Sequence, residues 1–460
     1  MDFKSGTLDT SYVSRKMDFH ETNGEICDKN GKLLFYSNGV WVGNTNNDTM
    51  LNGSGLNPSL LTSMYQDGLI LPQGNLIIPF SNDTSKYYLF HLTLDNYPYM
   101  HGALFLYYSI IDMSLDSGRG AVTQKNVILK NDSLIGGLLT ACKHANGRDW
   151  WLIAHQYNSN LYYKFLITPY GIEGPLTQNI GTVRTDFLLG QDCFSPDGKK
   201  FAWYEPVYKS IYYSGISYLD IYDFNRCTGD FSNPITVPIN DSAFLGGLAF
   251  SPNSQVLYAS SESYIYQFDL TAPDIAASQT TVAVWDSSFS PSYPLATTFY
   301  LSQLAPDGKI YINCGNGTLD IHVINNPDIV GLGCNVCQHC IRLPAYNAFT
   351  IANHPNYFLG ADSGSVCDTL TKVQSLSTQS SKLEIYPNPV VAEEVTFTYN
   401  VSSELGTINI YNIEGKEVAK YNLPQWSSVQ HLKLPKLSAG VYLARLTQGK
   451  VVADTKFLKE

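Results

Sequence analysis

The sequence predicts an all-β protein, with a β-propeller of seven blades, or of six, followed by a small antiparallel β-sandwich. Three observations favour this fold class. A tight turn followed by an alternating apolar and polar strand recurs along residues 1–365. All nine cysteines lie between Cys27 and Cys367, and the rest of the chain contains none. Two prolines, Pro387 and Pro389, then open a second series of short alternating strands.

Length and composition agree with two folded parts. A chain of 460 residues exceeds the roughly 250–300 residues that one core serves. Charged residues make up only 15%, against a usual level of about 25%, and 32 tyrosines with many Asn, Ser and Thr supply the polarity. This mixture favours strands and turns in a protein outside the cell.

The net charge of −11 is unevenly distributed, because residues 1–381 carry 20 basic and 32 acidic residues whereas residues 382–460 carry 9 and 8. An acidic main part argues against nucleic acid as a partner, since the phosphate backbone requires a basic face. No apolar run reaches the roughly 18–20 residues of a membrane-spanning helix. We therefore expect neither a nucleic-acid partner nor a transmembrane segment.

Six stretches of the first part predict β-hairpins. Asn-Gly and Asp-Gly adopt the positive φ angles of tight hairpin turns, and alternating hydrophobic residues flank most of these turns. From residue 143 the turns recur at roughly fifty-residue intervals, which is typical of propeller blades. The stretches are "CDKNGKLLFYSNG" (27–39), "LPQGNLIIPFSND" (71–83), "KHANGRDWWLIAHQ" (143–156), "FSPDGKKFAWYE" (194–205), "FSPNSQVLYASSESYIYQFDL" (250–270) and "LAPDGKIYINCGNGTLDIHVI" (304–324).

A seventh hairpin is expected in "FTIANHPNYFLGAD" (349–362), completed by a strand around Met1–Phe3. Each blade buries its faces against its neighbours, so the ring has to close. These considerations assign the propeller to residues 1–365. The alternative is an irregular pair of all-β sandwiches.

The last part reads as an immunoglobulin-like sandwich over residues 382–460. Pro387 and Pro389 fit an entry or edge segment, because proline has no N–H to donate. Six or seven short strands are expected in "EVTFTYNV" (394–401), "GTINIYNIEGKEVAKYNL" (406–423), "QHLKLPKL" (430–437) and "GVYLARLTQGKVVADTKFLK" (440–459). Residues 366–381, which are rich in Ser and Thr, form the expected linker.

Both parts resemble known families. "ETNGEICDKNGKLLFYSNGVWVGNTNNDTMLNGSGL", "HANGRDWWLIA", "LDIYDFNRCTGDFSNP" and "APDGKIYI" resemble the WD40-like propeller region of large secreted proteins from gliding and related bacteria. "LEIYPNPV", "INIYNIEGKEV", "LSAGVYLARL" and "TKFLK", in this order at the C-terminus, resemble the type A sorting domain of type IX secretion substrates.

The second resemblance implies export. It makes residues 382–460 the part that an outer-membrane translocon recognises and a sortase-like peptidase removes, with cleavage in the linker. The protein is then secreted or displayed at the cell surface, and a signal peptide is expected upstream of Met1, where none is visible. The residues that match the sorting motifs are Pro387, Asn388, Pro389, Gly415, Gly440, Tyr442 and Lys456.

Nine cysteines fit an oxidising compartment, and their odd number leaves at least one thiol unpaired. A disulfide is expected between two of Cys334, Cys337, Cys340 and Cys367. It is favoured over zinc, because "CNVCQHC" (334–340) lacks the second cysteine pair of a structural zinc site. A second bridge is suggested between Cys142 and Cys193, which precede turns of consecutive blades. Cys227 is either unpaired or bonded to a cysteine in a loop.

No catalytic motif stands out. The sequence has no GxSxG elbow, HExxH helix, phosphate loop or dinucleotide fingerprint, so no cofactor is expected. A binding or adhesion protein is therefore favoured, with a glycan or protein ligand at the propeller mouth, where Trp150 and Trp151 are candidates for stacking contacts. The alternatives are an exported hydrolase acting on polysaccharide or peptide, and a structural component of a surface layer.

Overall fold

The computed structural model describes residues 1–460 except 4, 7, 99–101, 184–188, 207, 211–212, 215, 292–293, 369–382, 392, 400–403, 425–426, 428 and 450. The chain divides into two compact units, Met1–Thr369 and Leu370–Glu460. Within the described residues the regular structure is nearly all β. The helical elements are α1 (Leu60–Met64) and the 3-10 turns η1 (Asp116–Gly118), η2 (Ala276–Ser278) and η3 (Gly331–Cys334).

The first two sheets of unit 1 are antiparallel sets of four strands. A single parallel pair, Leu51 with Ala121, joins them into one eight-stranded sheet. The strands are β1 (Gly24–Cys27), β2 (Leu33–Ser37), β3 (Trp41–Asn44) and β4 (Thr49–Ser54), followed by β5 (Asn75–Pro79), β6 (Lys86–His91), β7 (Gly102–Asp112) and β8 (Ala121–Ile135).

Four further sets follow, each a separate four-stranded antiparallel sheet. Between β14 and β17 the chain makes a small extra hairpin, β15 (Tyr208–Ser210) with β16 (Tyr213–Ser214). The sets are β9 (Thr140–Lys143), β10 (Trp150–His155), β11 (Leu161–Thr168) and β12 (Gly171–Asn179); β13 (Gln191–Phe194), β14 (Lys200–Glu205), β17 (Ser217–Asn225) and β18 (Asp230–Ile239); β19 (Gly247–Phe250), β20 (Val256–Ser261), β21 (Tyr264–Asp269) and β22 (Thr280–Val284); and β23 (Phe299–Leu304), β24 (Ile310–Cys314), β25 (Gly317–Ile324) and β26 (Val336–Ala348).

The turn between the first two strands is alike in five sets. An N–H bonds back three residues to a carbonyl, as from Gly198 to Ser195 at 2.8 Å, with equivalent bonds at Gly31, Gly147, Ser254 and Gly308. Gly198 has φ of 72°, and a Cβ there would lie 2.7 Å from the Cys142 Sγ atom, so glycine is required. Five of the six expected hairpin turns are therefore confirmed, whereas Gly74 precedes β5 and turns the chain into it.

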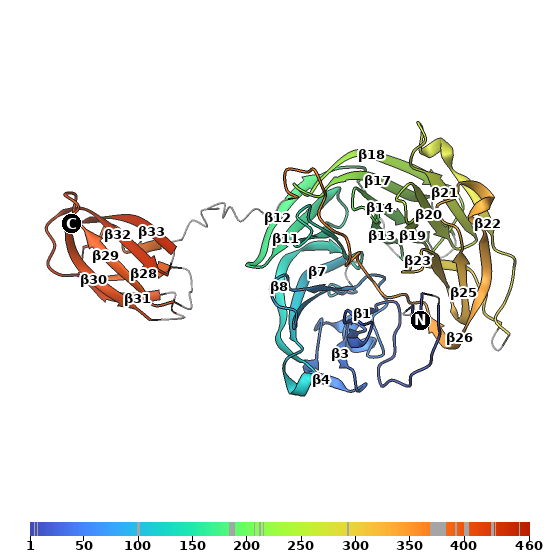
Figure 1. The fold of residues 1–460 in the computed structure, drawn as a ribbon, viewed down its shortest axis with the longest axis horizontal. Helices are drawn as coiled ribbons and strands as arrows, with labels where there is room; N and C mark the ends of the chain where they lie inside the picture. The colour runs from blue at the N-terminus through green and yellow to red at the C-terminus, as the bar shows by residue number, and fades with distance from the viewer. Residues whose placement is uncertain are drawn as a thin grey trace. The chain divides into compact units, whose positions relative to one another are not determined.

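Figure 1 shows the sets following one another around a common centre, with β13, β19 and β23 near the centre and β18 and β22 at the periphery. Because each set has four antiparallel strands, the chain enters and leaves it at the same end of the strands. The connections between sets therefore share one face of unit 1, and the turns within β1–β2 and β3–β4 and their equivalents share the other.

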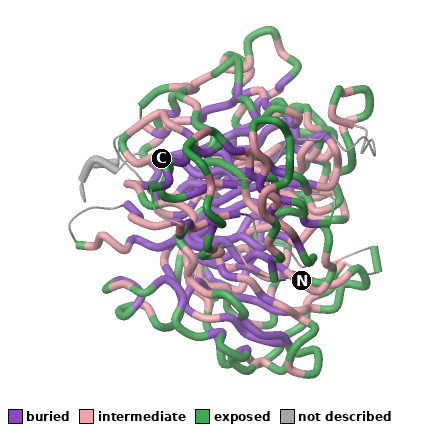
Figure 2. Tube along the Cα trace, turned by 90° about the vertical axis from the view of Figure 1, so that its left-hand side faces the viewer, coloured by how far each residue is buried: buried purple, intermediate pink, exposed green. Residues whose placement is uncertain are grey.

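A separate hydrophobic cluster fills each of the five spaces between successive sets. Phe35 and Leu89 pack between the first two sets, and Trp150 packs between the second and third. Equivalent clusters join the remaining sets. The outer face of the last set packs instead on Phe3 and Leu8. In Figure 2 the buried stretches run through the interior and the exposed stretches form connections.

The seventh hairpin expected at 349–362 is wrong, because this segment contains no strand, and Asp2 makes only an isolated bridge to Asp9. Residues 350–362 lie instead beside the first strands of several sets, and we call this segment the strap. Asn353 donates to the carbonyls of Asn75 and Leu139, and its N–H donates to the Asn23 carbonyl. Asn353 thus binds the strap to three main-chain carbonyls, in place of the hydrogen bonds of a paired strand.

Unit 2 consists of two antiparallel sheets around one hydrophobic cluster that includes Phe397, Ile408 and Phe457. Buried and exposed residues alternate along its strands, as expected for a sheet with one solvated face. One sheet has the order β27–β28–β31 and the other β30–β29–β32–β33. The strands are β27 (Leu383–Tyr386), β28 (Glu394–Tyr399), β29 (Gly406–Tyr411), β30 (Glu417–Leu423), β31 (Val429–Lys433), β32 (Gly440–Gln448) and β33 (Val451–Lys459).

Candidate functional site

The residues that match the sorting motifs meet at one end of unit 2. Asn388, between Pro387 and Pro389, uses its side chain as a clamp on β33. Its Nδ2 atom donates to the Lys456 carbonyl at 3.3 Å, and its Oδ1 atom accepts from the Leu458 N–H at 3.0 Å. The structure thus brings together the two ends of the sequence motif, which lie about seventy residues apart.

The two glycines lie at the same end. Gly415 has φ of 79° in the turn between β29 and β30, which the Asn412 side chain holds by accepting from the N–H groups of Glu414 and Lys416. Gly440 opens β32 and pairs in register with Lys459. Since Tyr411 at the end of β29 pairs with Leu443, the turn and the start of β32 are adjacent.

Tyr442 is buried beside this end. Its ring stacks on Phe457 with centroids 5.6 Å apart, and its hydroxyl donates to the Ser438 carbonyl at 2.9 Å. Lys456, one position from Phe457, is exposed. Most of the motif residues therefore determine the structure of this end, and Lys456 is an exposed cation beside them.

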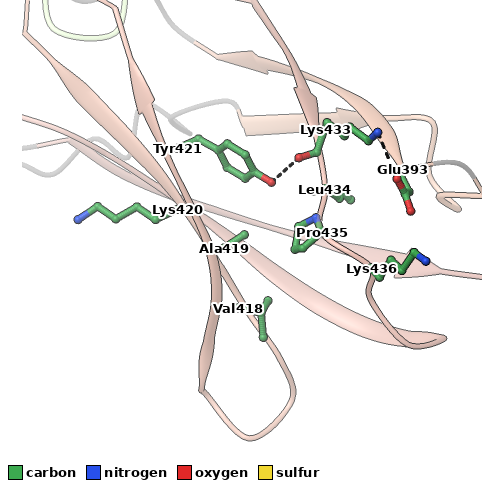
Figure 3. A pocket seen from close by; sticks show the side chains of 9 residues that line it. All are labelled: Glu393, Val418, Ala419, Lys420, Tyr421, Lys433, Leu434, Pro435 and Lys436. Atoms are coloured by element: carbon green, nitrogen blue, oxygen red, sulfur yellow. Dashed lines mark hydrogen bonds and ion pairs between the residues drawn. The ribbon is translucent and has the colours of Figure 1, made fainter.

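The long edge of unit 2 opposite β33 contains an open groove of about 550 Å³ between β30 and β31 (Figure 3). Val418, Ala419 and Tyr421 of β30 line one side, and Leu434 and Pro435 line the other. The Tyr421 hydroxyl crosses the groove and donates to the Lys433 carbonyl at 2.7 Å. Burial raises the pKa of that hydroxyl, so it stays protonated and able to donate.

Two disulfides occur in unit 1. Cys337 bonds to Cys340, two of the four cysteines among which a bridge was expected, and Cys367 bonds to Cys227. The suggested bridge between Cys142 and Cys193 is wrong. Cys142 packs into the cluster between the third and fourth sets, whereas Cys193 packs into the cluster between the fourth and fifth, so the two thiols point into different spaces.

His144, Cys227 and Cys367 form a group with the spacing of metal ligands, since their ligand atoms lie within 4.8 Å of one another. The two sulfurs are bonded to each other. The His144 Nδ1 atom accepts from the Asn146 N–H, and its Nε2 atom therefore donates to the Cys227 carbonyl. Every group is satisfied without an ion, so these residues fit a disulfide and not a metal site.

Cys314 and His322 place a thiol beside an imidazole, with Sγ and Nε2 3.3 Å apart. The His322 Nδ1 atom accepts from the His339 N–H, so its Nε2 atom carries the proton and cannot take one from the thiol. Burial raises the pKa of Cys314 to about 12 and lowers that of His322 to about 4. Both features describe a structural pair.

Three carboxyl groups of unit 1 have pKa values raised by burial. Burial raises the pKa of Glu21 to about 8, with the Tyr300 side chain acting in the opposite direction. Burial raises the pKa of Asp95 to about 6, while the Leu104 N–H bonds to it at 2.5 Å. Burial also raises the pKa of Asp192, whose main-chain N–H donates to Gln73.

Trp150 and Trp151 are buried in the clusters between sets, so the prediction that a ligand stacks on them is wrong. A cavity of about 10 Å³ beside Glu205 has room for one water molecule and none for a sugar. Asn353 and the groove of unit 2 carry no local motif, so neither stands out in the sequence.

Comparison with protein families matches residues 384–460 to the secretion system C-terminal sorting domain. No curated protein matches the chain. Among solved structures, PorZ, a surface component of the type IX secretion system of Porphyromonas gingivalis, is 10% identical with a TM-score of 0.26, covering 83% of this chain and 59% of PorZ.

Two enzymes are also similar. The periplasmic gluconolactonase of Pseudomonas aeruginosa is 12% identical with a TM-score of 0.29, covering 65% of this chain and 75% of the enzyme. An exo-β-1,3-galactanase of Phanerochaete chrysosporium is 10% identical with a TM-score of 0.33, covering 89% and 97%. Scores this low do not transfer a fold or an activity.

The cellular location of the protein follows from the family match. The chain ends in a type IX sorting domain, and the protein is secreted or displayed at the cell surface. In the described residues no helix is long and apolar enough to cross a membrane.

Proposed function

We propose that the chain is a binding protein exported by the type IX system, with unit 1 as a six-bladed β-propeller and unit 2 as its sorting domain. The translocon recognises the end of unit 2 where the sorting motifs meet, and a sortase-like peptidase cuts within residues 366–381. The observation that carries the proposal is the clamp of Asn388 on β33, inside the segment that matches the sorting family.

The propeller assignment, over residues 1–365, is supported by the repeated architecture of unit 1. Six sets of four strands follow one another around a centre in Figure 1, and the spaces between successive sets hold their own hydrophobic clusters. The strap supplies polar contacts at the centre, where Gln73 bonds to both the Asp192 carbonyl and the Asn353 side chain.

The proposed cleavage keeps unit 1 intact. Of the linker 366–381, only 366–368 belong to the described residues. Cys367 is bonded to Cys227 in the fourth set, so a cut after Cys367 leaves the strap attached to unit 1 at its end. The mature protein then keeps its whole disulfide framework.

Binding is assigned to the face formed by the connections between sets. Large apolar side chains are exposed there, with Leu60 and Met64 of α1 54% and 55% exposed and Phe289 54% exposed. Exposed apolar groups of this size mark interaction surfaces when several share one face. The ligand class is an extracellular glycan or protein.

Export is tested by fractionating cells that express the full chain, a chain ending at residue 381, or the Asn388→Ala variant. We expect the full chain at the surface or in the medium and both variants in the periplasm. The matched control is Asn422→Ala, an exposed asparagine on β30. Surface delivery of the chain ending at residue 381 would overturn the sorting role.

Binding is tested on a glycan array and a panel of extracellular matrix proteins. We expect Phe289→Ser to weaken any interaction found, and Tyr170→Ser to leave it unchanged, because Tyr170 is 86% exposed in a turn on the opposite face. Chromogenic glycosides and peptides serve as parallel substrates. Turnover of any of them would replace binding by hydrolysis as the function of unit 1.

A further inference from the structure

The two long edges of unit 2 are built differently. At the edge that carries β33, the main chain joins the two sheets, since the Val390 N–H donates to the Leu458 carbonyl at 2.7 Å and the Glu460 N–H donates to the Val390 carbonyl at 3.1 Å. Lys459 adds a bond from its ammonium group to the Val391 carbonyl. The part of this edge at Lys456–Glu460 is therefore closed to a further strand.

The other edge is open. Within the described residues, β30 pairs with β29 alone and β31 pairs with β28 alone, so each strand presents one unpaired side to the groove. Figure 3 shows Tyr421 reaching across to the Lys433 carbonyl at one end, with Val418 and Ala419 further along β30 and Pro435 opposite. Unpaired edges of this kind are templates for an added strand.

The groove combines an apolar floor with a basic rim. Leu434 is buried and Val418, Ala419 and Tyr421 are half-buried, whereas Lys420, Lys433 and Lys436 are exposed. Lys433 pairs with Glu393, the one acidic residue in the lining, at 3.6 Å. Among the described residues, no ion pair is found for Lys420 or Lys436. The rim thus keeps an excess of positive charge.

We propose that this groove binds an extended acidic segment of a partner protein, which adds as a strand along the free side of β30. Main-chain hydrogen bonds to β30 hold the segment, and its alternate side chains face the apolar floor. The acidic side chains between them lie near Lys420 and Lys436. A phosphate-bearing lipid can match the charge and the apolar floor, but it has no main chain to pair with the free strand edge.

This inference rests on the proposed function in one respect, because it names the kind of partner that a sorting domain contacts away from the motif end. Peptide binding by the purified chain and export from cells are separate measurements. If the chain binds the peptide but is not exported, only the sorting role is contradicted. If the chain is exported but does not bind the peptide, only the proposal for the groove is contradicted.

The test uses the full chain and a fluorescent ten-residue peptide of alternating Val and Glu, followed by anisotropy. We expect the variant Lys420→Glu/Lys436→Glu to bind roughly tenfold more weakly, as for the loss of two exposed ion pairs. The variant Lys29→Glu/Lys416→Glu makes the same change in net charge at exposed sites outside the groove and keeps the affinity.

Changes in the peptide avoid any effect on folding. Methylation of alternate peptide nitrogens removes strand pairing, and we expect it to abolish binding. A peptide of alternating Val and Lys should not bind. Four outcomes would each overturn the proposal. The methylated peptide binds as well as the unmodified one, or both protein variants lose the same affinity. Alternatively, the Val–Glu peptide does not bind, or phosphatidylglycerol vesicles displace it.

Discussion

The side chain of Asn388 is bonded to the main chain on both sides of Phe457, through the Lys456 carbonyl at 3.3 Å and the Leu458 N–H at 3.0 Å. It therefore fixes the proline-flanked entry of unit 2 onto its last strand. The ring of Phe457 faces the core, where it stacks on Tyr442. The same contact holds the entry segment and positions the exposed Lys456.

Replacing Asn388 with Ala should destabilise unit 2. Two neutral hydrogen bonds are lost, and each contributes about 1 kcal/mol to the free energy of unfolding, so a loss of about 2 kcal/mol is expected. Differential scanning calorimetry should show a lower transition temperature for unit 2 and an unchanged transition for unit 1. Asn388→Asp keeps the acceptor and should fall between. Equal transitions in wild type and Asn388→Ala would contradict the clamp.

Asn353 should contribute clearly to the stability of unit 1. Its Nδ2 atom donates to Asn75 and Leu139 at 2.9 and 2.7 Å, and its Oδ1 atom accepts from Gln73 at 3.2 Å. Asn353→Ala leaves buried partners without bonds, which costs about 1–3 kcal/mol for each. Urea unfolding should show a loss of about 3 kcal/mol or more. Asn356→Ala, at an exposed position of the same strap, should cost less than about 1 kcal/mol.

The two disulfides should contribute unequally to stability. Cys227 and Cys367 are 140 residues apart in sequence, whereas Cys337 and Cys340 are three apart. In the chain-entropy description the longer loop stabilises by about 3 kcal/mol more. The double variant Cys227→Ser/Cys367→Ser should therefore unfold at a clearly lower guanidinium concentration than Cys337→Ser/Cys340→Ser. The reverse order would show that the Cys227–Cys367 bond does not stabilise by constraining the unfolded chain.

The local parts of the fold were predictable because their causes are local. The turn at Ser195–Lys199 needs only a proline, an aspartate and a glycine in adjacent positions, and the alternation of β28 and β32 needs only one solvated face. The sorting motif was equally visible, since Asn388, Gly415 and Gly440 have fixed roles in turns or at strand ends.

The parts that the sequence did not predict depend on contacts between distant residues. The bonds of Asn353 reach partners 214 to 280 positions away, so nothing around 349–362 distinguishes a strap from a strand. Cys142 and Cys193 occupy equivalent positions of successive sets, so each thiol enters the space that follows its own set, a separation that only the packing of the sets reveals. The groove lies between the edges of two sheets, and no sequence motif indicates how far apart these edges are.

Glu21 should make the stability of unit 1 fall as the pH rises. Its side chain is 5% exposed, and burial raises its pKa from 4.5 to about 8. Between these two values the folded state holds a proton that the unfolded state has lost. The contribution of Glu21 to stability is therefore fully present below pH 4.5 and is lost as the pH rises to about 8. Glu21→Gln removes this decline and should exceed wild type by on the order of 5 kcal/mol at pH 9, with little difference at pH 4.5. Urea unfolding at both pH values measures this, with the exposed Glu173→Gln as control. A Glu21→Gln variant that is no more stable than wild type at pH 9 would show that Glu21 ionises in the folded protein without cost.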